Sequence, residues 1–142
     1  MNTELVKQEI AKDKSFNRHD PDFISLAYTN LEGANFEGAN LEGAYLEGAD
    51  LYRANLEGAN LKGAHLEGAK LFGANLKGAN LETANLEGAD FETADLEGAN
   101  LHFAEIEGAN LERTKLGGAD LRGTNLKGAF LFGADMEGAK LE

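Results

Sequence analysis

A large apolar residue recurs at every fifth position from Leu31 to Leu141, and this period restricts the fold more than any other feature of the chain. Leucine fills most of these central positions, and the exceptions are Phe36, Phe91, Ile106 and Met136. Alanine stands two residues before the centre, with threonine instead at Thr29, Thr114 and Thr124. Asparagine or aspartate usually precedes the centre and glycine usually follows it by two residues, so the unit is A-(N/D)-L-x-G. A weaker unit, ISLAY, occupies residues 24–28.

Neither regular secondary structure buries a five-residue period. On an α-helix, five residues advance by about 500°, so successive leucines would wrap around all faces. On a straight strand, an odd period sends successive leucines to opposite faces. A backbone that bends once per repeat solves the problem, because alanine and leucine lie two residues apart and share one face of a very short strand. Glycine, which tolerates a positive φ angle, then forms the corner.

Departures from the repeat indicate four sides per turn of the chain. Tyr52, Phe72 and Phe132 all follow a central leucine, and their positions in the sequence differ by multiples of twenty. Corners without glycine are separated by multiples of ten, and they are Arg53, Thr83, Thr93, Phe103 and Arg113. A rung of four repeats therefore places equivalent side chains above one another.

The run of A-(N/D)-L-x-G units resembles the pentapeptide-repeat family over about residues 24–142. The resemblance implies an all-β solenoid, a right-handed quadrilateral parallel β-helix of about six four-sided rungs. It also implies that the central residues from Leu31 to Leu141 and the alanines from Ala34 to Ala139 point inward. Thr114 and Thr124 then place hydroxyl groups in the core, where we expect them to donate to backbone carbonyls.

The two ends of such a stack need cover, because each exposes unpaired backbone groups. Residues 1–23 are predicted to form a short N-terminal capping α-helix, from Thr3 to Asp13, and a linker. The C-terminal rung has no comparable segment, so we expect its open end to pair with a second copy in a homodimer. A shortened chain, or an end left in water, is the alternative. The candidate dimer residues are Leu126, Leu131, Met136 and Leu141.

Three sets of outward side chains are candidate functional surfaces. An acidic ladder runs along one side and consists of Glu47, Glu67, Glu87 and Glu107, followed by Lys127. Such a ladder could bind cations or imitate a phosphate backbone, and its alternative interpretation is a solvated face that keeps the stack in solution. A neighbouring side is expected to be acidic as well, with Glu37, Glu57, Asp95, Glu97, Asp135 and Glu137 against Lys77 and Lys115. The candidate partner surface consists of Tyr52, Phe72, Phe130, Phe132, Arg53 and Arg113. The alternative interpretation of its aromatic residues is that they only stack on one another between rungs.

The chain offers few residues for catalysis. It contains no cysteine, its histidines His19, His65 and His102 have no metal-ligand spacing relative to one another, and no G-x-G-x-x-G segment occurs. We therefore expect no enzyme, cofactor or metal site. A formal net charge of −12 disfavours direct contact with nucleic acid and anionic membranes. With no apolar segment of about 20 residues and no signal peptide, the expected location is the cytoplasm.

Three functions remain open. The first is a non-enzymatic scaffold for protein–protein interaction, because a solenoid offers an extended rigid surface. The second is a DNA mimic, since some members of the family that the chain resembles bind type II topoisomerases such as gyrase. The third is a structural assembly unit that associates end to end. The regular recurrence of the segment LEGAN is similar to the repeats of many cyanobacterial members of that family.

Overall fold

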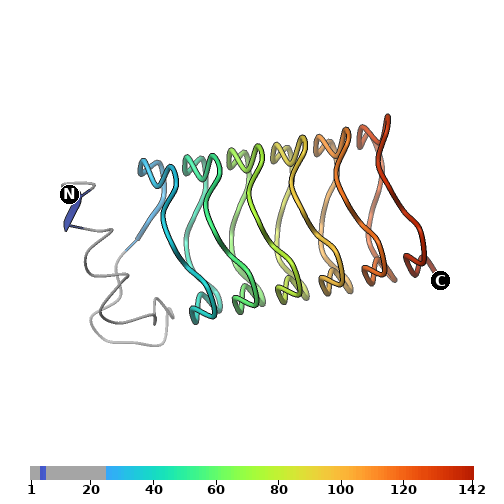
Figure 1. Ribbon diagram of the computed structural model, residues 1–142, viewed down its shortest axis with the longest axis horizontal. Coiled ribbons are helices and arrows are strands. Elements are labelled where there is room, and N and C mark those ends of the chain that lie inside the picture. The colour runs from blue at the N-terminus through green and yellow to red at the C-terminus, as the bar shows by residue number, and fades with distance from the viewer. Residues whose placement is uncertain (1–3, 6–24) are drawn as a thin grey trace.

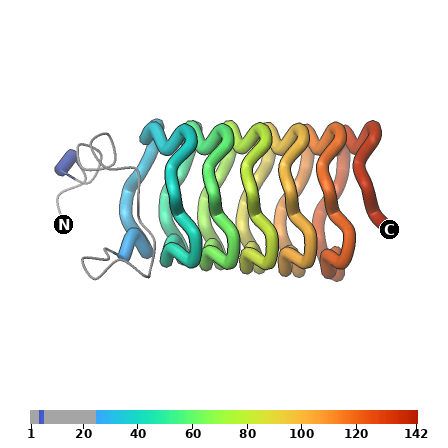
Figure 2. The backbone as a smooth tube through the Cα atoms, turned by 90° about the horizontal axis from the view of Figure 1, so that it is seen from below, coloured from blue at the N-terminus to red at the C-terminus, as the bar shows by residue number. Residues whose placement is uncertain are grey.

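The computed structural model describes residues 4–5 and 25–142. Coils of equal size follow one another along the long axis, from the coil that begins near residue 25 at one end to the C-terminus at the other (Figures 1 and 2). The bridges between successive coils are parallel, and they form columns such as Asn30, Asp50, Lys70, Asp90, Asn110 and Phe130. The all-β solenoid is confirmed. Each contact between coils is a single-residue bridge, so the short strands expected from the sequence are reduced to one residue per repeat.

The backbone of one repeat shows how the coils are joined. The Leu66 amide donates to the Asn85 carbonyl at 2.8 Å, and the Gly68 amide donates to the Glu87 carbonyl at 2.9 Å. In the reverse direction, the Asn85 amide donates to the Ala64 carbonyl at 2.9 Å. Each repeat therefore exchanges several hydrogen bonds with the next coil, which explains how a stack without long strands holds together.

A tight turn follows every central residue. The Ala69 amide donates back to the Leu66 carbonyl at 3.0 Å, and the third residue of the turn, Gly68, has a φ of 64°. This positive φ, which normally selects glycine, recurs at every corner from residue 28 to residue 138. Six corners adopt it without glycine, at a steric cost, and they are Tyr28, Arg53, Thr83, Thr93, Phe103 and Arg113.

The residue before the centre supports the same turn. The Asn85 side-chain oxygen accepts a hydrogen bond from the Glu87 amide at 3.0 Å, and Asp95 accepts one from the Glu97 amide at 3.0 Å. Equivalent bonds recur in many repeats, which accounts for the preference for asparagine or aspartate at this position. Asparagine amides also bond between coils, as from Asn100 to Asn80 at 3.3 Å.

The core is a narrow aliphatic column. Central residues from Leu31 to Leu121 are at most 2% exposed, and alanines from Ala34 to Ala119 are buried with them. The predicted threonine bonds are present: the Thr114 hydroxyl donates to the Phe91 carbonyl at 2.8 Å, and the Thr124 hydroxyl donates to the Leu121 carbonyl at 2.7 Å. The inward positions predicted from the repeat are thus confirmed over this range.

The coil has four sides, since four turns separate each residue from its bridge partner in the next coil. We name each side by its central residues. The ladder face has Leu26, Leu46, Leu66, Leu86, Ile106 and Leu126, and the aromatic face has Leu31, Leu51, Leu71, Phe91, Leu111 and Leu131. The second acidic face has Phe36, Leu56, Leu76, Leu96, Leu116 and Met136, and the asparagine face has Leu41, Leu61, Leu81, Leu101, Leu121 and Leu141.

One expectation about these sides is wrong. The ladder face and the second acidic face are offset by two repeats, which is half a coil, so they lie on opposite sides of the stack and are not neighbours. Each has a net charge of −4, with five acidic and one basic side chain on the ladder face and six acidic and two basic on the other. The acidity is therefore divided between two opposite faces.

The predicted N-terminal cap lies mostly outside the described residues. Glu4 and Leu5 are helical, and the remainder of the expected helix from Thr3 to Asp13 and of the linker to residue 23 is not among them. Within the part of the chain that is described, no helix has the length and apolar character to span a bilayer.

Candidate functional site

The acidic ladder has one glutamate per coil on the ladder face. Its members differ in their contacts. Glu107 is bonded to the Asn125 amide at 3.3 Å and to the Lys127 ammonium group at 3.5 Å. Glu67 accepts a hydrogen bond from the Asn85 amide at 2.8 Å through Oε1, whereas Glu87 is exposed. The ladder is therefore not a uniform row of solvated carboxylates.

Its N-terminal part includes a histidine. The Nδ1 atom of His65 lies 3.6 Å from Oε1 of Glu67, and the imidazole ring packs against Tyr45 with a centroid separation of 5.0 Å. Glu47, His65 and Glu67 each bring one potential ligand atom within 4.8 Å of the others. The Oε2 atoms of both glutamates are shielded from solvent and have no hydrogen-bond partner.

Sequence reasoning missed this group because it compared histidines only with one another. The signal is present in the numbering: Glu47 and Glu67 are one coil apart, and His65 stands two residues before Glu67 on the same side. A search for ligands at the spacing of one coil would have found it.

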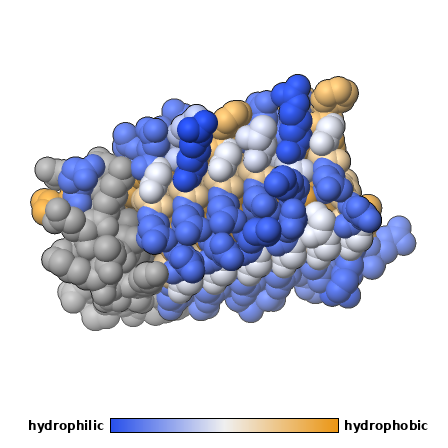
Figure 3. Space-filling view, in the orientation of Figure 1, coloured by the Kyte–Doolittle hydropathy of each residue, from blue (hydrophilic) through white to orange (hydrophobic). Residues whose placement is uncertain are grey.

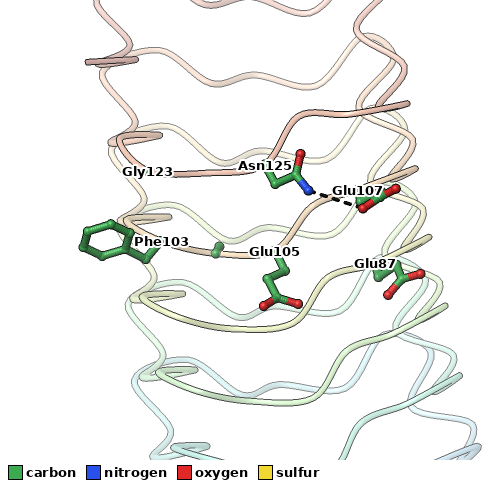
Figure 4. Close-up of a pocket in the computed structure, with 7 residues that line it drawn as sticks. Glu87, Phe103, Glu105, Glu107, Gly123 and Asn125 are labelled. Atoms are coloured by element: carbon green, nitrogen blue, oxygen red, sulfur yellow. Dashed lines mark hydrogen bonds between the residues drawn. The ribbon is translucent and has the colours of Figure 1, made fainter.

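A shallow depression of about 360 Å³ lies farther along the ladder face and reaches the corner next to it. Glu87, Glu107 and Asn125 form one side, with the Asn125–Glu107 hydrogen bond at its edge, and Phe103 stands at the other (Figure 4). Its walls combine carboxylates with one exposed ring, and it is open to water on one side.

The residues of the candidate partner surface lie on the aromatic face in two separate parts. Tyr52 stacks on Phe72 with a centroid separation of 5.6 Å and an angle of 10° between the rings, and the Arg53 guanidinium lies 5.0 Å from the Tyr52 centroid. These side chains are engaged with one another. Glu92 and Glu112 follow in the same column and separate them from the last coil.

The second part lies in the last coil. Phe130 and Phe132 flank Leu131 and are 58% and 74% exposed. The Arg113 guanidinium, one coil earlier, forms an ion pair with the Glu92 carboxylate at 3.2 Å. Hydrophilic side chains run in rows along the visible side of the molecule, and apolar atoms appear at its upper edge and toward the C-terminal end (Figure 3).

The candidate dimer end is less buried than the rest of the core. Leu126, Leu131 and Met136 are partly buried, and Leu141 is 52% exposed. Among the described residues, the amide groups that point away from the stack in this coil have no hydrogen-bond partner; they belong to Leu126, Gly128, Leu131, Gly133, Met136 and Gly138.

The asparagine face holds an ion pair that sequence reasoning did not identify. Arg122 Nε donates to Asp120 Oδ1 at 2.9 Å, and Arg122 Nη2 donates to Oδ2 at 2.6 Å. These side-chain hydrogen bonds, together with the charge of Arg122, hold the pKa of the Asp120 carboxyl well below its usual value. The two residues lie on either side of a central leucine, which is the spacing that could have revealed the pair.

With this geometry in view, comparison with known proteins identifies the family. The family model for pentapeptide repeats matches residues 24–58, 49–88, 74–113 and 104–142. The chain is a pentapeptide-repeat protein. A search of curated proteins finds no match.

Solved structures of pentapeptide-repeat proteins are similar to this chain. Rfr23 from the cyanobacterium Cyanothece 51142 is 30% identical, with 97% of each chain covered and a TM-score of 0.67. The protein alr5209 from Nostoc Pcc 7120 is 30% identical, with 98% of this chain and 93% of that chain covered and a TM-score of 0.53. HetL from Nostoc sp. Strain PCC 7120, which is involved in heterocyst differentiation regulation, is 33% identical with a TM-score of 0.51. The match covers 82% of this chain but only 63% of HetL.

Proposed function

We propose that this pentapeptide-repeat protein is a non-enzymatic scaffold that binds another protein through its last coil. The observation that carries the proposal is the exposure of Phe130 and Phe132 on either side of a partly buried leucine. Exposed aromatic side chains next to partly buried apolar ones are typical of protein-binding patches, and aromatic residues are enriched among the side chains that dominate binding energy. By contrast, Tyr52 and Phe72 already stack on each other and offer less free surface.

The test is affinity capture with two matched variants. Phe130→Ala combined with Phe132→Ala removes the proposed contact, and Phe103→Ala removes a ring with the same 58% exposure as Phe130 at a corner of another side. We expect a protein retained by the native chain and by Phe103→Ala to be lost with the double variant. Retention of every captured protein by the double variant would refute this contact.

A second copy is the partner that we propose for the open edge of the last coil. Its amide groups point away from the stack, and the carbonyls of Ala129, Ala134 and Ala139 likewise accept no backbone hydrogen bond among the described residues. An edge with both donors and acceptors is able to pair with a copy of itself. Light scattering of the full chain at micromolar concentration should give the mass of a dimer. A monomer mass would contradict this, and steady growth of longer oligomers would favour the structural assembly unit.

Imitation of DNA is the second candidate function, and the charge of the stack favours it. Residues 25–142 carry 20 acidic and nine basic side chains, a net charge of −11. Six coils spaced by about 4.8 Å span about 29 Å, a length over which duplex DNA carries about 17 phosphate charges. The stack therefore has roughly two-thirds of the charge density of DNA. A gyrase supercoiling assay tests this directly: inhibition or protection from quinolones would favour the mimic, and neither effect at high micromolar protein would exclude it.

A further inference from the structure

We propose that Glu47, His65 and Glu67 form a binding site for a divalent transition-metal ion, with zinc as the expected ion. The three side chains lie on the ladder face, Glu47 in one coil and the other two in the next. Their potential ligand atoms lie within 4.8 Å of one another. Around a tetrahedral zinc ion with bonds of about 2.1 Å, ligand atoms are about 3.4 Å apart. Rotation about the side-chain torsions of the two flexible glutamates brings the ligand atoms closer by the remaining distance.

The two orphan oxygens are an independent reason to expect a cation. Oε2 of Glu47 and Oε2 of Glu67 are shielded from solvent and accept no hydrogen bond. Burying a carboxylate oxygen without a partner is unfavourable, and two adjacent carboxylates also repel each other. A cation between them removes both costs. The other oxygen of Glu67 accepts a hydrogen bond from the Asn85 amide at 2.8 Å, which orients the carboxylate and leaves Oε2 for the ion.

The histidine determines the class of ion. A site made only of carboxylates favours calcium or magnesium, whereas an imidazole nitrogen favours zinc and its neighbours in the transition series. The His65 Nδ1 atom faces Glu67 at 3.6 Å, and the ring is held by its contact with Tyr45. The contact of the ring with Tyr45 and the hydrogen bond to the Glu67 carboxylate limit the reorganisation that metal binding requires.

The rest of the ladder provides a contrast. Glu87 is the next member of the column, but it is exposed and no histidine precedes it. Glu107 already has Asn125 and Lys127 as partners. The site is therefore a local feature of two coils, and a bound ion would link these coils and stabilise the stack by preferential binding to the folded chain.

Isothermal titration of the full chain with zinc chloride in a non-chelating buffer tests the proposal. We expect one zinc ion per chain. Glu47→Gln and His65→Asn should each weaken binding by at least about tenfold, a loss within the range seen when groups that tune a metal site are removed. Asparagine is a safe replacement for His65, since Asn85 and Asn125 hold the same position in later coils. Thermal melts of every variant check that each one folds.

Two control variants complete the design. Glu87→Gln removes a carboxylate of the same column, and His102→Asn removes a histidine from another side of the coil. Both should bind zinc as the native chain does, and calcium should bind much more weakly than zinc. In NMR spectra, zinc should shift the ring signals of His65 and leave those of His102 unchanged. Absence of zinc binding at millimolar metal, equal losses in the control variants, or equal affinity for calcium would overturn the proposal.

Discussion

Substitution of Gly123 by alanine tests how one coil covers the corner of the next. A Cβ atom at this position would lie 2.4 Å from Cδ1 and 2.6 Å from Cε1 of Phe103, which stands at the equivalent corner one coil earlier. No real Cβ atom tolerates such contacts, so the ring must leave the corner. Gly98→Ala is the matched control, because its φ of 66° is similar to the 73° at Gly123 and no atom lies within 4 Å of its added Cβ.

The magnitudes differ between the two substitutions. Both replace glycine at a positive φ, which costs about 1–2 kcal/mol. Both recover about 0.4–1 kcal/mol through the less flexible unfolded chain. We therefore expect Gly98→Ala to lower the free energy of unfolding by about 0.5–1 kcal/mol. Phe103 is 58% exposed, so its covered part is roughly 80 Å² of a large aromatic side chain, and displacing it adds about 1–2 kcal/mol for Gly123→Ala.

Urea unfolding followed by circular dichroism measures these free energies. The variants needed are the two glycine substitutions, Phe103→Ala, and Phe103→Ala combined with Gly123→Ala. The additional cost of Gly123→Ala should disappear when Phe103 is alanine, with a coupling energy of about 1–2 kcal/mol. Equal costs for Gly98→Ala and Gly123→Ala, or additive effects in the double variant, would refute the packing of Phe103 over this corner.

Three further predictions concern the core, the corners and the surface. Leu86→Ala, within the fully buried column, should cost about 2–5 kcal/mol in urea unfolding, and Leu131→Ala in the partly exposed last coil should cost less than half as much. Thr83→Gly should raise the free energy of unfolding by about 0.5–1 kcal/mol, because a β-branched residue there has a φ of 57°; a loss would contradict this. Because the pKa of Asp120 is lowered in the folded chain by Arg122, its stabilising effect is present above the unfolded pKa of about 4 and is lost as pH falls below it. Asp120→Asn should therefore flatten the decrease of thermal midpoint between about pH 4 and pH 2 relative to the native chain, and an unchanged slope would contradict this.

The repeat predicted most of the fold, because each position of the unit has one physical task. The central leucines fill the core, the alanines leave space for them, and the corner glycines supply positive φ, so a reading of Leu31 to Leu121 predicts burial correctly. The reasoning also predicted the Thr114 hydroxyl bond, since a buried hydroxyl needs an acceptor. The two acidic faces were wrongly predicted to be neighbours, although the offset of ten residues between their central positions already places them on opposite sides of a coil of twenty residues.

The candidate surfaces were harder to predict because they depend on the conformations of long side chains. The Arg53 guanidinium turns toward Tyr52. Glu67 places one carboxylate oxygen against the Asn85 amide and the other where solvent does not reach it. These choices depend on rotamers and on neighbours one coil away, not on the repeat itself. Whether Phe130 and Phe132 contact a partner stays a prediction that binding experiments must test.

Paired cysteines test the central claim, the coil of four repeats, most directly. The chain has no native cysteine, and Asn55 and Asn75 form a parallel bridge between successive coils. Neighbouring strands are about 4.8 Å apart, which suits a disulfide. The account predicts that Asn55→Cys with Asn75→Cys gives an intramolecular disulfide on mild oxidation, while Asn55→Cys with a cysteine at Lys70 or Asn80 does not. A disulfide in one of those two alternative pairs, and none in the pair at Asn55 and Asn75, would contradict it.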